Sequence, residues 1–326
     1  MANSLKKSEL HGIKPSYSTK YGNAYIGDSI DLLRGLEDET VDLVITSPPF
    51  ALLREKEYGN KTQEDYILWL AKFAELVYKK LKKSGSFVLD LGGAYKKGVP
   101  TRSLYNFKVP IHFCEQIGFH LAQDFYWYNP AKLPSPIEWV NKRKIRVKDS
   151  VNPVWWFSKT EWPKANVKAV LNPYSDRMKK LLENPGKYYQ PKKRPSGHDI
   201  AASFGKDNGG AIPANLLQIS NSESNGPYLA ACKEIGVRQH PARFPAKLPE
   251  FFIDFLTEPD DLIVDIFSGS NTAGWVAENR KRKWLAFDND RQYVAASVLR
   301  FIDKNQNTAS KKKIFTRILD GEHVVV

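Results

Sequence analysis

The residues Ser47, Pro48, Pro49 and Phe50 directly follow an apolar run at 41–46. Proline cannot continue a hydrogen-bonded strand and favours an extended backbone, so a buried strand should end here in a rigid turn. That turn would present a hydroxyl, backbone carbonyls and an aromatic ring at one end of a sheet. Such groups can accept hydrogen bonds and stack on a flat molecule. On these residues alone, a strand that simply ends in a Pro-Pro turn is an equally good interpretation.

A second candidate site follows another apolar run, at 262–267. A turn of small residues leads from this run into a helix, and the next predicted strand ends in an acid. The residues concerned are Asp265, Phe267, Gly269, Ser270, Asn271, Thr272 and Asp288. Small residues let a ligand approach the backbone, and an acid at that strand end is where a nucleotide-binding sheet holds ribose hydroxyls. The turn lacks the Gly-x-Gly-x-x-Gly fingerprint of dinucleotide sites, and an ordinary strand-turn-helix is the alternative.

The elements that would position these residues alternate between strands and helices. Apolar and aromatic runs predict buried strands, which lie at 25–28, 41–45, 86–91, 121–128, 151–157, 262–267 and 284–287. Apolar residues at helical spacing predict helices, which lie at 29–36, 62–83, 109–117, 248–256, 272–279 and 291–302. The lysines near the end of the 62–83 helix are expected to close it, since positive charge suits that end of the dipole. The alternation predicts an α/β fold with a doubly wound, mostly parallel sheet.

The stretch between 158 and 236 differs from its flanks. Its periodicity fades while Pro, Gly, Asn and Lys accumulate, yet its aromatic and aliphatic residues argue against a flexible linker. A long irregular stretch within a compact domain is usually functional, so an inserted recognition region is expected. The chain is therefore divided into an N-terminal arm (1–17), a catalytic half (18–157), a target-recognition region (158–236), a cofactor-binding half (237–305) and a C-terminal tail (306–326).

Composition narrows the class of protein. The 326 residues include 42% apolar residues, enough for one large core, and carry a formal charge of +13. Such a basic chain favours nucleic acid over small acidic substrates as a partner. Its two cysteines, Cys114 and Cys232, have no metal-ligand spacing, so no metal is expected and a cytoplasmic setting fits. No membrane span or signal peptide is predicted.

These features together resemble the β group of DNA amino-methyltransferases, in which the catalytic turn precedes the variable region and the cofactor strand. Four segments are similar to the PvuII-type cytosine-N4-specific DNA methyltransferases, namely 46–50, 90–95, 132–139 and 194–199. The resemblance covers about residues 18–305 and implies a seven-stranded class I methyltransferase sheet in permuted order. It also implies S-adenosyl-L-methionine as cofactor, double-stranded DNA as partner, and a restriction-modification system whose endonuclease forms no stable complex with this chain. The recognition site that it suggests is a short palindrome, CAGCTG.

The resemblance implies direct methyl transfer from the sulfonium to the N4 amine of a flipped cytosine. Phe50 would stack on the base, while the Ser47 hydroxyl and the Pro48 carbonyl accept the amine hydrogens. Because that amine is a poor nucleophile, acceptors that favour its pyramidal form stabilise charge that arises only in the transition state. The base must leave the duplex to reach them. Asp90 would orient Ser47, and its alternative role is to cap the following turn.

The resemblance also assigns residues to the cofactor, while basic stretches and a glycine-containing loop indicate residues that contact DNA. Asp28 would lie beside the adenine, although it can equally cap the 29–36 helix. Phe244 would help to close over the methionine end, or else fill the core. Asn271 replaces the second glycine of the family's Phe-x-Gly-x-Gly turn. Phosphate and base-edge contacts are predicted for basic and polar residues, with a solvated surface as the alternative; they are Lys142, Arg143, Lys144, Arg146, Arg194, Ser196, His198 and Asp199.

Three other functions compete with this one. Carbon-5 methylation needs an attacking thiolate, usually one that follows a proline, and neither cysteine does so. Adenine-N6 methylation usually uses Asp or Asn at the position of Ser47, and it stays open. A non-catalytic DNA-binding specificity protein also stays open, although both motifs are intact. Titration with S-adenosylmethionine would distinguish that last class.

Overall fold

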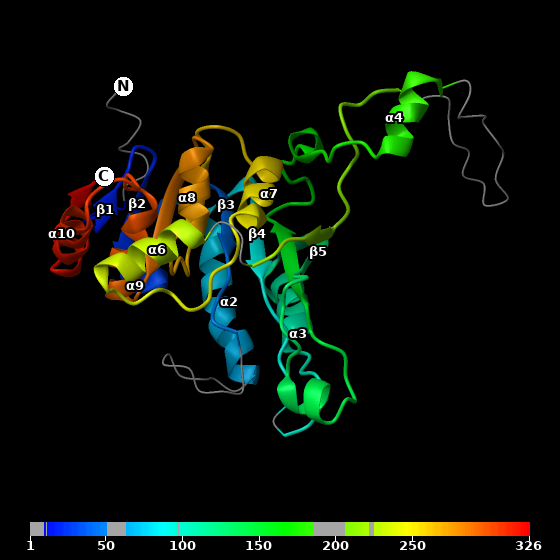
Figure 1. Ribbon diagram of the computed structural model, residues 1–326, viewed down its shortest axis with the longest axis horizontal. Coiled ribbons are helices and arrows are strands. Elements are labelled where there is room, and N and C mark those ends of the chain that lie inside the picture. The colour runs from blue at the N-terminus through cyan, green and yellow to red at the C-terminus, as the bar shows by residue number, and fades with distance from the viewer. Residues whose placement is uncertain (1–9, 11, 51–62, 97, 186–205, 222–224) are drawn as a thin grey trace. The chain divides into compact units, whose positions relative to one another are not determined.

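The computed structural model describes residues 10, 12–50, 63–96, 98–185, 206–221 and 225–326 (Figure 1). The chain forms two compact units, of which the smaller is Ala165–Ala214 and the larger combines Met1–Lys164 with Asn215–Val326. The described part of the smaller unit includes a 3-10 turn (Val167–Val170) and the helix α4 (Asp176–Glu183). This unit is shorter than the region expected at 158–236, because the residues after 214 contribute a strand and a helix to the larger unit.

The larger unit is built on one mixed sheet. Its described strands are β1 (Tyr17–Ser18), β2 (Gly22–Ile26), β3 (Val41–Thr46), β4 (Leu81–Asp90), β5 (His120–Tyr128), β6 (Val151–Ser158), β7 (Leu216–Gln218), β8 (Leu262–Asp265), β9 (Lys283–Asp288) and β10 (Val324–Val325). Their order is β10-β1-β2-β9-β8-β3-β4-β6-β5-β7. The central strands β2, β9, β8, β3 and β4 are parallel, and β6 is antiparallel to β4 and β5. Ten strands thus occur in the described residues where seven were expected, because β10 and β1 add two short strands at one side of the sheet and β7 adds one at the other.

Helices cover both faces of this sheet. They are α1 (Ser29–Arg34), α2 (Gln63–Lys80), α3 (Tyr105–His112), α6 (Gly226–Ile235), α7 (Lys247–Leu256), α8 (Thr272–Asn279), α9 (Arg291–Ser297) and α10 (Thr308–Leu319). Helices α6 to α10 pack on one buried cluster, and α1, α2 and α3 pack on a second. Residues of β3 alternate between the clusters, with Leu43 and Ile45 in the first and Val44 in the second. The doubly wound α/β fold is therefore confirmed.

Helix α2 ends earlier than its lysines predict. It stops at Lys80, and the following residues open β4 instead of closing the helix. The cause is burial and charge pairing: Leu81 is 0% exposed, and the Lys82 ammonium lies 2.7 Å from both carboxylate oxygens of Asp42 on β3. Lys79 and Lys80 therefore lie in the last turn of the helix as predicted, whereas Lys82 connects two neighbouring strands.

The C-terminal segment is part of the fold as well. The polar tail expected at 306–326 contains α10 and β10, and β10 pairs with β1 at the edge of the sheet. Lys311 is only 6% exposed, and its ammonium lies 2.8 Å from a carboxylate oxygen of Glu234 on α6. An ion pair therefore ties α10 to α6, which sequence polarity alone did not indicate.

The parallel strands bring the two candidate motifs to the same end of the sheet, where their carboxyl ends lie. Strand β3 is the centre, since Leu43 pairs with Ile263 of β8 and Thr46 pairs with Leu89 of β4. The carboxyl ends of β3, β4, β8 and β9 consequently meet, which is where open α/β sheets bind ligands.

Candidate functional site

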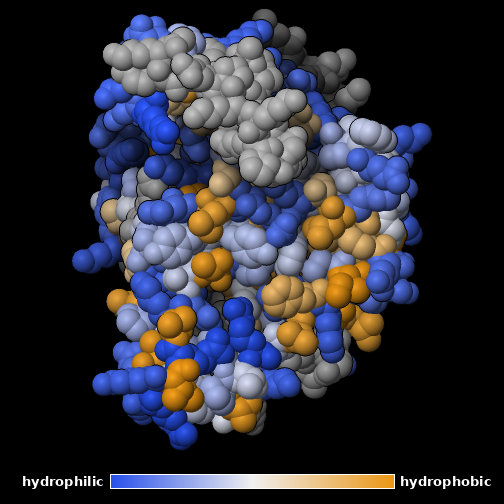
Figure 2. Space-filling model, turned by 90° about the vertical axis from the view of Figure 1, so that its right-hand side faces the viewer, coloured by the Kyte–Doolittle hydropathy of each residue, from blue (hydrophilic) through white to orange (hydrophobic). Residues whose placement is uncertain are grey.

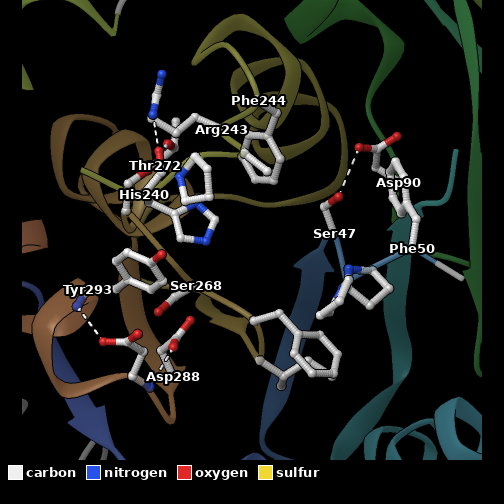
Figure 3. A pocket seen from close by; sticks show the side chains of 18 of the residues that line it. Ser47, Phe50, Asp90, His240, Arg243, Phe244, Ser268, Thr272, Asp288 and Tyr293 are labelled. Carbon is white, nitrogen blue, oxygen red and sulfur yellow. Dashed lines mark hydrogen bonds between the residues drawn. The ribbon is translucent and has the colours of Figure 1, made fainter. Parts of the chain in front are cut away.

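A cavity of about 430 Å³ opens at the carboxyl ends of these strands (Figure 3). Figure 3 shows Ser47, Phe50 and Asp90 on one side of it, and Thr272 and Asp288 on the other. The predicted site residues that line it are Asp28, Ser47, Pro48, Pro49, Phe50, Asp90, Phe244, Phe267, Ser270, Thr272 and Asp288. Two motifs that are distant in the sequence thus share one cavity, and we call its two walls the catalytic side and the cofactor side.

On the catalytic side, the Ser47 hydroxyl donates a hydrogen bond of 3.0 Å to Oδ2 of Asp90. Asp90 is the last residue of β4 and is only 5% exposed. Burial raises the pKa of its carboxyl to about 7, although the Ser47 hydrogen bond opposes the rise. The described residues show no hydrogen bond from Asp90 to the turn that follows. A carboxyl that titrates near neutrality beside a hydroxyl can orient it and can exchange a proton with it.

The ring of Phe50 lies against the backbone just beyond the end of β4. A Cβ atom at Gly92 would lie 2.4 Å from Cε2 of Phe50, so glycine is required for the ring to lie there. Tyr105 of α3 holds the same segment, since its hydroxyl donates to the Gly92 carbonyl. The ring is therefore fixed at the cavity wall, where a flat ligand can stack on it.

On the cofactor side, Asp288 ends β9 and accepts two backbone hydrogen bonds. The Gly269 amide donates to Oδ2 at 2.8 Å, and the Asp290 amide donates to Oδ1 at 2.9 Å. Burial raises the pKa of Asp288, while these hydrogen bonds oppose the rise. Each carboxylate oxygen can accept a further hydrogen bond, so Asp288 can bind hydroxyl groups of a ligand as well as its own backbone.

The turn after β8 holds its shape through Asn271 and Gly269, which do not line the cavity. Asn271 has the left-handed conformation (φ 52) that a glycine at this position would supply. Its side chain accepts from the Gly274 amide at 3.1 Å and donates to the Tyr17 hydroxyl at 2.9 Å. Gly269 is also left-handed (φ 49), and a Cβ there would lie 2.8 Å from the His240 ring. Asparagine therefore replaces glycine here without losing the turn.

Asp265 lies behind the turn rather than in the cavity wall. It is 2% exposed, and its Oδ1 accepts from the Thr46 hydroxyl at 2.7 Å and from the Phe267 amide at 3.1 Å. Burial raises the pKa of its carboxyl to about 7, although the Thr46 hydrogen bond opposes the rise. These contacts tie the end of β8 to β3, so from this position Asp265 acts on a ligand only through the turn.

The alternatives left open for Asp28 and Phe244 are not exclusive. The Asp28 side chain accepts from the Ile30 amide at 2.8 Å, which caps α1, and Asp28 also lines the cavity. Phe244 packs against the buried cluster that contains Phe252 and lines the cavity as well. Each residue therefore has a structural contact and remains available to a ligand.

Comparisons with known proteins show which family this chain belongs to. A family model described as DNA methylase matches residues 41–299. The chain belongs to this DNA methylase family. The Type II methyltransferase M.PvuII of Proteus hauseri is 66% identical over 95% of this chain and 93% of its own length. A solved structure described as PvuII DNA methyltransferase (cytosine-N4-specific) is 56% identical, with a TM-score of 0.80 over 96% of this chain and 98% of that one. The M1.HpyAVI–SAM complex, 18% identical with a TM-score of 0.52 over 86% of this chain and 98% of that one, shares the fold.

Several residues of the methylase cavity were not found from sequence patterns. Trp69 and Phe73 reach it from α2, with ring centroids 5.7 Å and 5.0 Å from that of Phe267. Their spacing indicates only a helix face that packs on a core. Trp127 at the end of β5 and Asn152 at the start of β6 line the catalytic side, and nothing local marks them as site residues. The other unpredicted lining residues include Ser29, Asn221 and Tyr293, and His240 and Arg243 line the cavity beside the predicted Phe244.

The predicted DNA contacts fall into two sets. Four of them lie outside the described residues: Arg194, Ser196, His198 and Asp199. The other four lie in the loop between β5 and β6: Lys142, Arg143, Lys144 and Arg146. Phosphate contacts from both sets stay predictions.

The basic residues of the β5–β6 loop differ in the contacts that their side chains make within the protein. Lys142 and Arg143 pair with Glu138, at 3.3 Å and 3.0 Å. Arg146 lies over the Tyr95 ring, 4.7 Å from its centroid, and donates to a backbone carbonyl. Lys144 is exposed and has no ion pair within the described residues. Lys144 is therefore the most available of the four to a phosphate.

The described residues contain no group of three or more metal-ligating side chains. Within that same part of the chain, no helix is long and apolar enough to cross a membrane.

Proposed function

We propose that this chain transfers a methyl group from S-adenosyl-L-methionine to the N4 amine of a cytosine flipped out of duplex DNA. The observation that carries this proposal is the Ser47–Asp90 pair, which faces the Asp288 side across one cavity. The proposal is supported by the 66% identity to M.PvuII and by the cytosine-N4-specific description of the structure that is 56% identical.

The residues of the cofactor side fit an adenosine with a sulfonium group. Asp288 offers carboxylate acceptors to ribose hydroxyls, and Asp28 offers another at the cavity edge. The rings of Phe267 and Phe73 both line the cavity, and either offers an apolar face on which an adenine can stack. When bound, the cofactor supplies an activated methyl group; the protein supplies the place and the orientation.

The residues of the catalytic side fit the amine of a cytosine. With Asp90 ionised, the Ser47 proton is directed to Oδ2, which leaves the hydroxyl oxygen free to accept an amine hydrogen. The Pro48 carbonyl accepts the second hydrogen, and Phe50 stacks on the ring. The nitrogen becomes positively charged as it takes the methyl group, so these acceptors stabilise the transition state more than the ground state. The product amine then loses a proton, which Asp90 can receive through Ser47.

The test is to incubate the purified protein with methyl-labelled S-adenosylmethionine and duplex DNA that contains CAGCTG. Digestion of the DNA should release N4-methylcytosine, and a duplex without that site should stay unmodified. N6-methyladenine as the product would make the chain an adenine methyltransferase. Binding of the cofactor without any methylated product would favour a non-catalytic specificity protein. Asp288→Ala should weaken cofactor binding, which isothermal titration measures directly.

Sequence recognition is proposed for the region 158–236 and for the basic loop between β5 and β6. Lys144→Gln should weaken binding to all DNA sequences alike and flatten the dependence on salt by about one unit of slope. His198→Ala should instead reduce binding to the cognate site more than to random DNA, because base contacts carry sequence information. A cognate endonuclease that acts without a stable complex, and a cytoplasmic location, complete the proposal.

A further inference from the structure

The loop that joins β5 to β6, residues 129–150, leaves and rejoins the sheet at the edge of the methylase cavity. Trp127 shortly before it and Asn152 shortly after it both line the cavity. Lys132 lies early in the loop, and its ammonium and the Asp90 carboxyl each influence the pKa of the other. The first turn of this loop is therefore at the catalytic side of the cavity.

Hydrogen bonds between its two branches hold this loop in shape. The Lys148 ammonium donates to the Lys132 carbonyl at 3.2 Å, and the Asp149 amide donates to the Ser135 carbonyl at 3.2 Å. Leu133 lies between these two anchored positions and is 79% exposed. The backbone on both sides of Leu133 is therefore held by hydrogen bonds, while its side chain contacts solvent.

The loop combines positive charge with exposed aliphatic side chains. It carries six basic and two acidic residues. Four of its aliphatic residues are more than half exposed: Leu133 (79%), Ile137 (61%), Ile145 (59%) and Val147 (84%). Figure 2 shows hydrophobic side chains interspersed with hydrophilic ones at the lower end of the face on which this loop lies. A second copy of the chain would meet this surface with like charge, which opposes pairing of the two loops.

An opened DNA duplex offers what such a surface requires. Its phosphates attract the basic side chains, and the bases beside an extruded nucleotide expose apolar faces that water solvates poorly. Proteins that unstack DNA commonly insert an aliphatic wedge into the opened step. Of the four exposed aliphatic residues, Leu133 and Val147 lie closest along the chain to the ends of the loop, and Leu133 directly follows Lys132, the lysine that is coupled to Asp90.

We propose that Leu133 enters the duplex and fills the gap that the target cytosine leaves when it moves into the cavity. This inference rests on the proposed function, because it assumes that the enzyme methylates a flipped base. Leu133 contacts neither the cofactor nor the reacting amine; it stabilises the open duplex while Ser47, Pro48 and Phe50 bind the extruded base.

The test uses two duplexes, one with the target cytosine paired to guanine and one with it opposite a mismatched base. A mismatched base is easier to extrude, so the second duplex needs less help from a wedge. Leu133→Ala should lower the single-turnover methylation rate on the paired duplex about tenfold, but by less than about twofold on the mismatched one. Leu133→Met should retain the wild-type rate on both. The matched control is Val325→Ala on β10, at the opposite end of the sheet, where Val325 is 72% exposed; it should change neither rate.

A fluorescent 2-aminopurine next to the target cytosine gives a second readout. Its fluorescence should rise when wild-type protein binds and rise less with Leu133→Ala. An equal loss of rate on both duplexes, or no loss on either, would overturn the inference while leaving the proposed function intact. Dimerisation or binding to anionic lipid vesicles that Leu133→Ala abolishes, with unchanged methylation, would also overturn it. If wild-type protein forms no N4-methylcytosine on either duplex, the proposed function itself fails.

Discussion

Two adjacent hydroxyl residues at the end of β3 make the same kind of contact with opposite consequences. Thr46 donates to Asp265 on β8 at 2.7 Å, and Ser47 donates to Asp90 on β4 at 3.0 Å. Burial raises the pKa of both carboxyls to about 7. Ser47 and Asp90 line the large cavity, whereas Thr46 and Asp265 do not. Access to the cavity, not the chemistry of the pair, separates a candidate catalytic pair from a structural one.

The geometry of a strand end explains this difference. Successive residues of an extended chain point to opposite faces of the sheet, and at this strand end Thr46 bonds to a residue of β8 while Ser47 bonds to a residue of β4. Thr46 is 1% exposed, and its hydroxyl also accepts from the Phe267 amide at 3.2 Å, which closes the turn after β8. The Ser47 oxygen keeps acceptor capacity toward the cavity. One hydroxyl therefore fixes the cofactor side, and the other is available to a substrate.

The largest expected effect comes from Ser47→Ala. The rate of methyl transfer should fall by an amount equivalent to about 2–4 kcal/mol, because an acceptor that acts mainly in the transition state is lost. The affinity for S-adenosylmethionine should stay the same. Single-turnover kinetics and cofactor titration measure the two quantities separately. An equal loss of cofactor affinity would show that Ser47 is structural, and the contrast with Thr46 would disappear.

A smaller change in the methylation rate is expected when the pH is varied, and this change should depend on Asp90. As the pH falls through about 7, Asp90 takes up a proton that it can donate to the Ser47 oxygen, which then can no longer accept an amine hydrogen. The methylation rate should therefore decline below neutral pH, and Asp90→Asn should be slow at every pH without this inflection. If the Asp90→Asn variant keeps the inflection near pH 7, the inflection comes from the titration of another group.

The same carboxyl should affect stability in the opposite direction. Its folded-state pKa is raised, so the unfolded chain loses this proton at lower pH than the folded chain does. The folded state is therefore favoured at acidic pH, and this contribution is lost as the pH rises from about 4 through about 7. At pH 8, the free energy of unfolding of Asp90→Asn should then exceed that of the wild type by on the order of 2 kcal/mol, with little difference at pH 4. Urea denaturation at the two pH values measures this difference. A variant that is less stable at pH 8 would contradict this sign.

The sequence predicts most of the residues in this contrast, but it does not predict which of the two hydroxyls faces the cavity. The Ser47–Phe50 turn and Asp288 are marked by residue type, because prolines stop a strand and an acid ends one. The sequence also predicts that β3 is buried. It does not show which of two adjacent hydroxyls faces a cavity, since that depends on which strands lie beside β3. Strand order is set by long-range packing that local periodicity does not contain.

Other errors have the same origin. Trp69 of α2 lines the cavity through its contact with the Phe267 ring, yet helical spacing indicates only a core face. Lys82 was assigned to a helix end, and its ion pair with Asp42 on a neighbouring strand places it in β4. Each of these residues is decided by a partner far away in the sequence, so its role appears only in the folded chain.

The smallest expected effect is on the structural pair. Thr46→Val preserves side-chain shape but removes the hydroxyl that donates to Asp265, which leaves a buried carboxyl oxygen with only the Phe267 amide. The free energy of unfolding should fall by about 1–2 kcal/mol at neutral pH, the usual cost of a lost partner for a buried polar group. Thr46→Ser keeps the hydroxyl and should lose less. Urea denaturation measures both, and methylation per folded molecule should change little in either variant. A Thr46→Val protein that is fully stable but slow in methyl transfer would show that the two hydroxyls share one catalytic role.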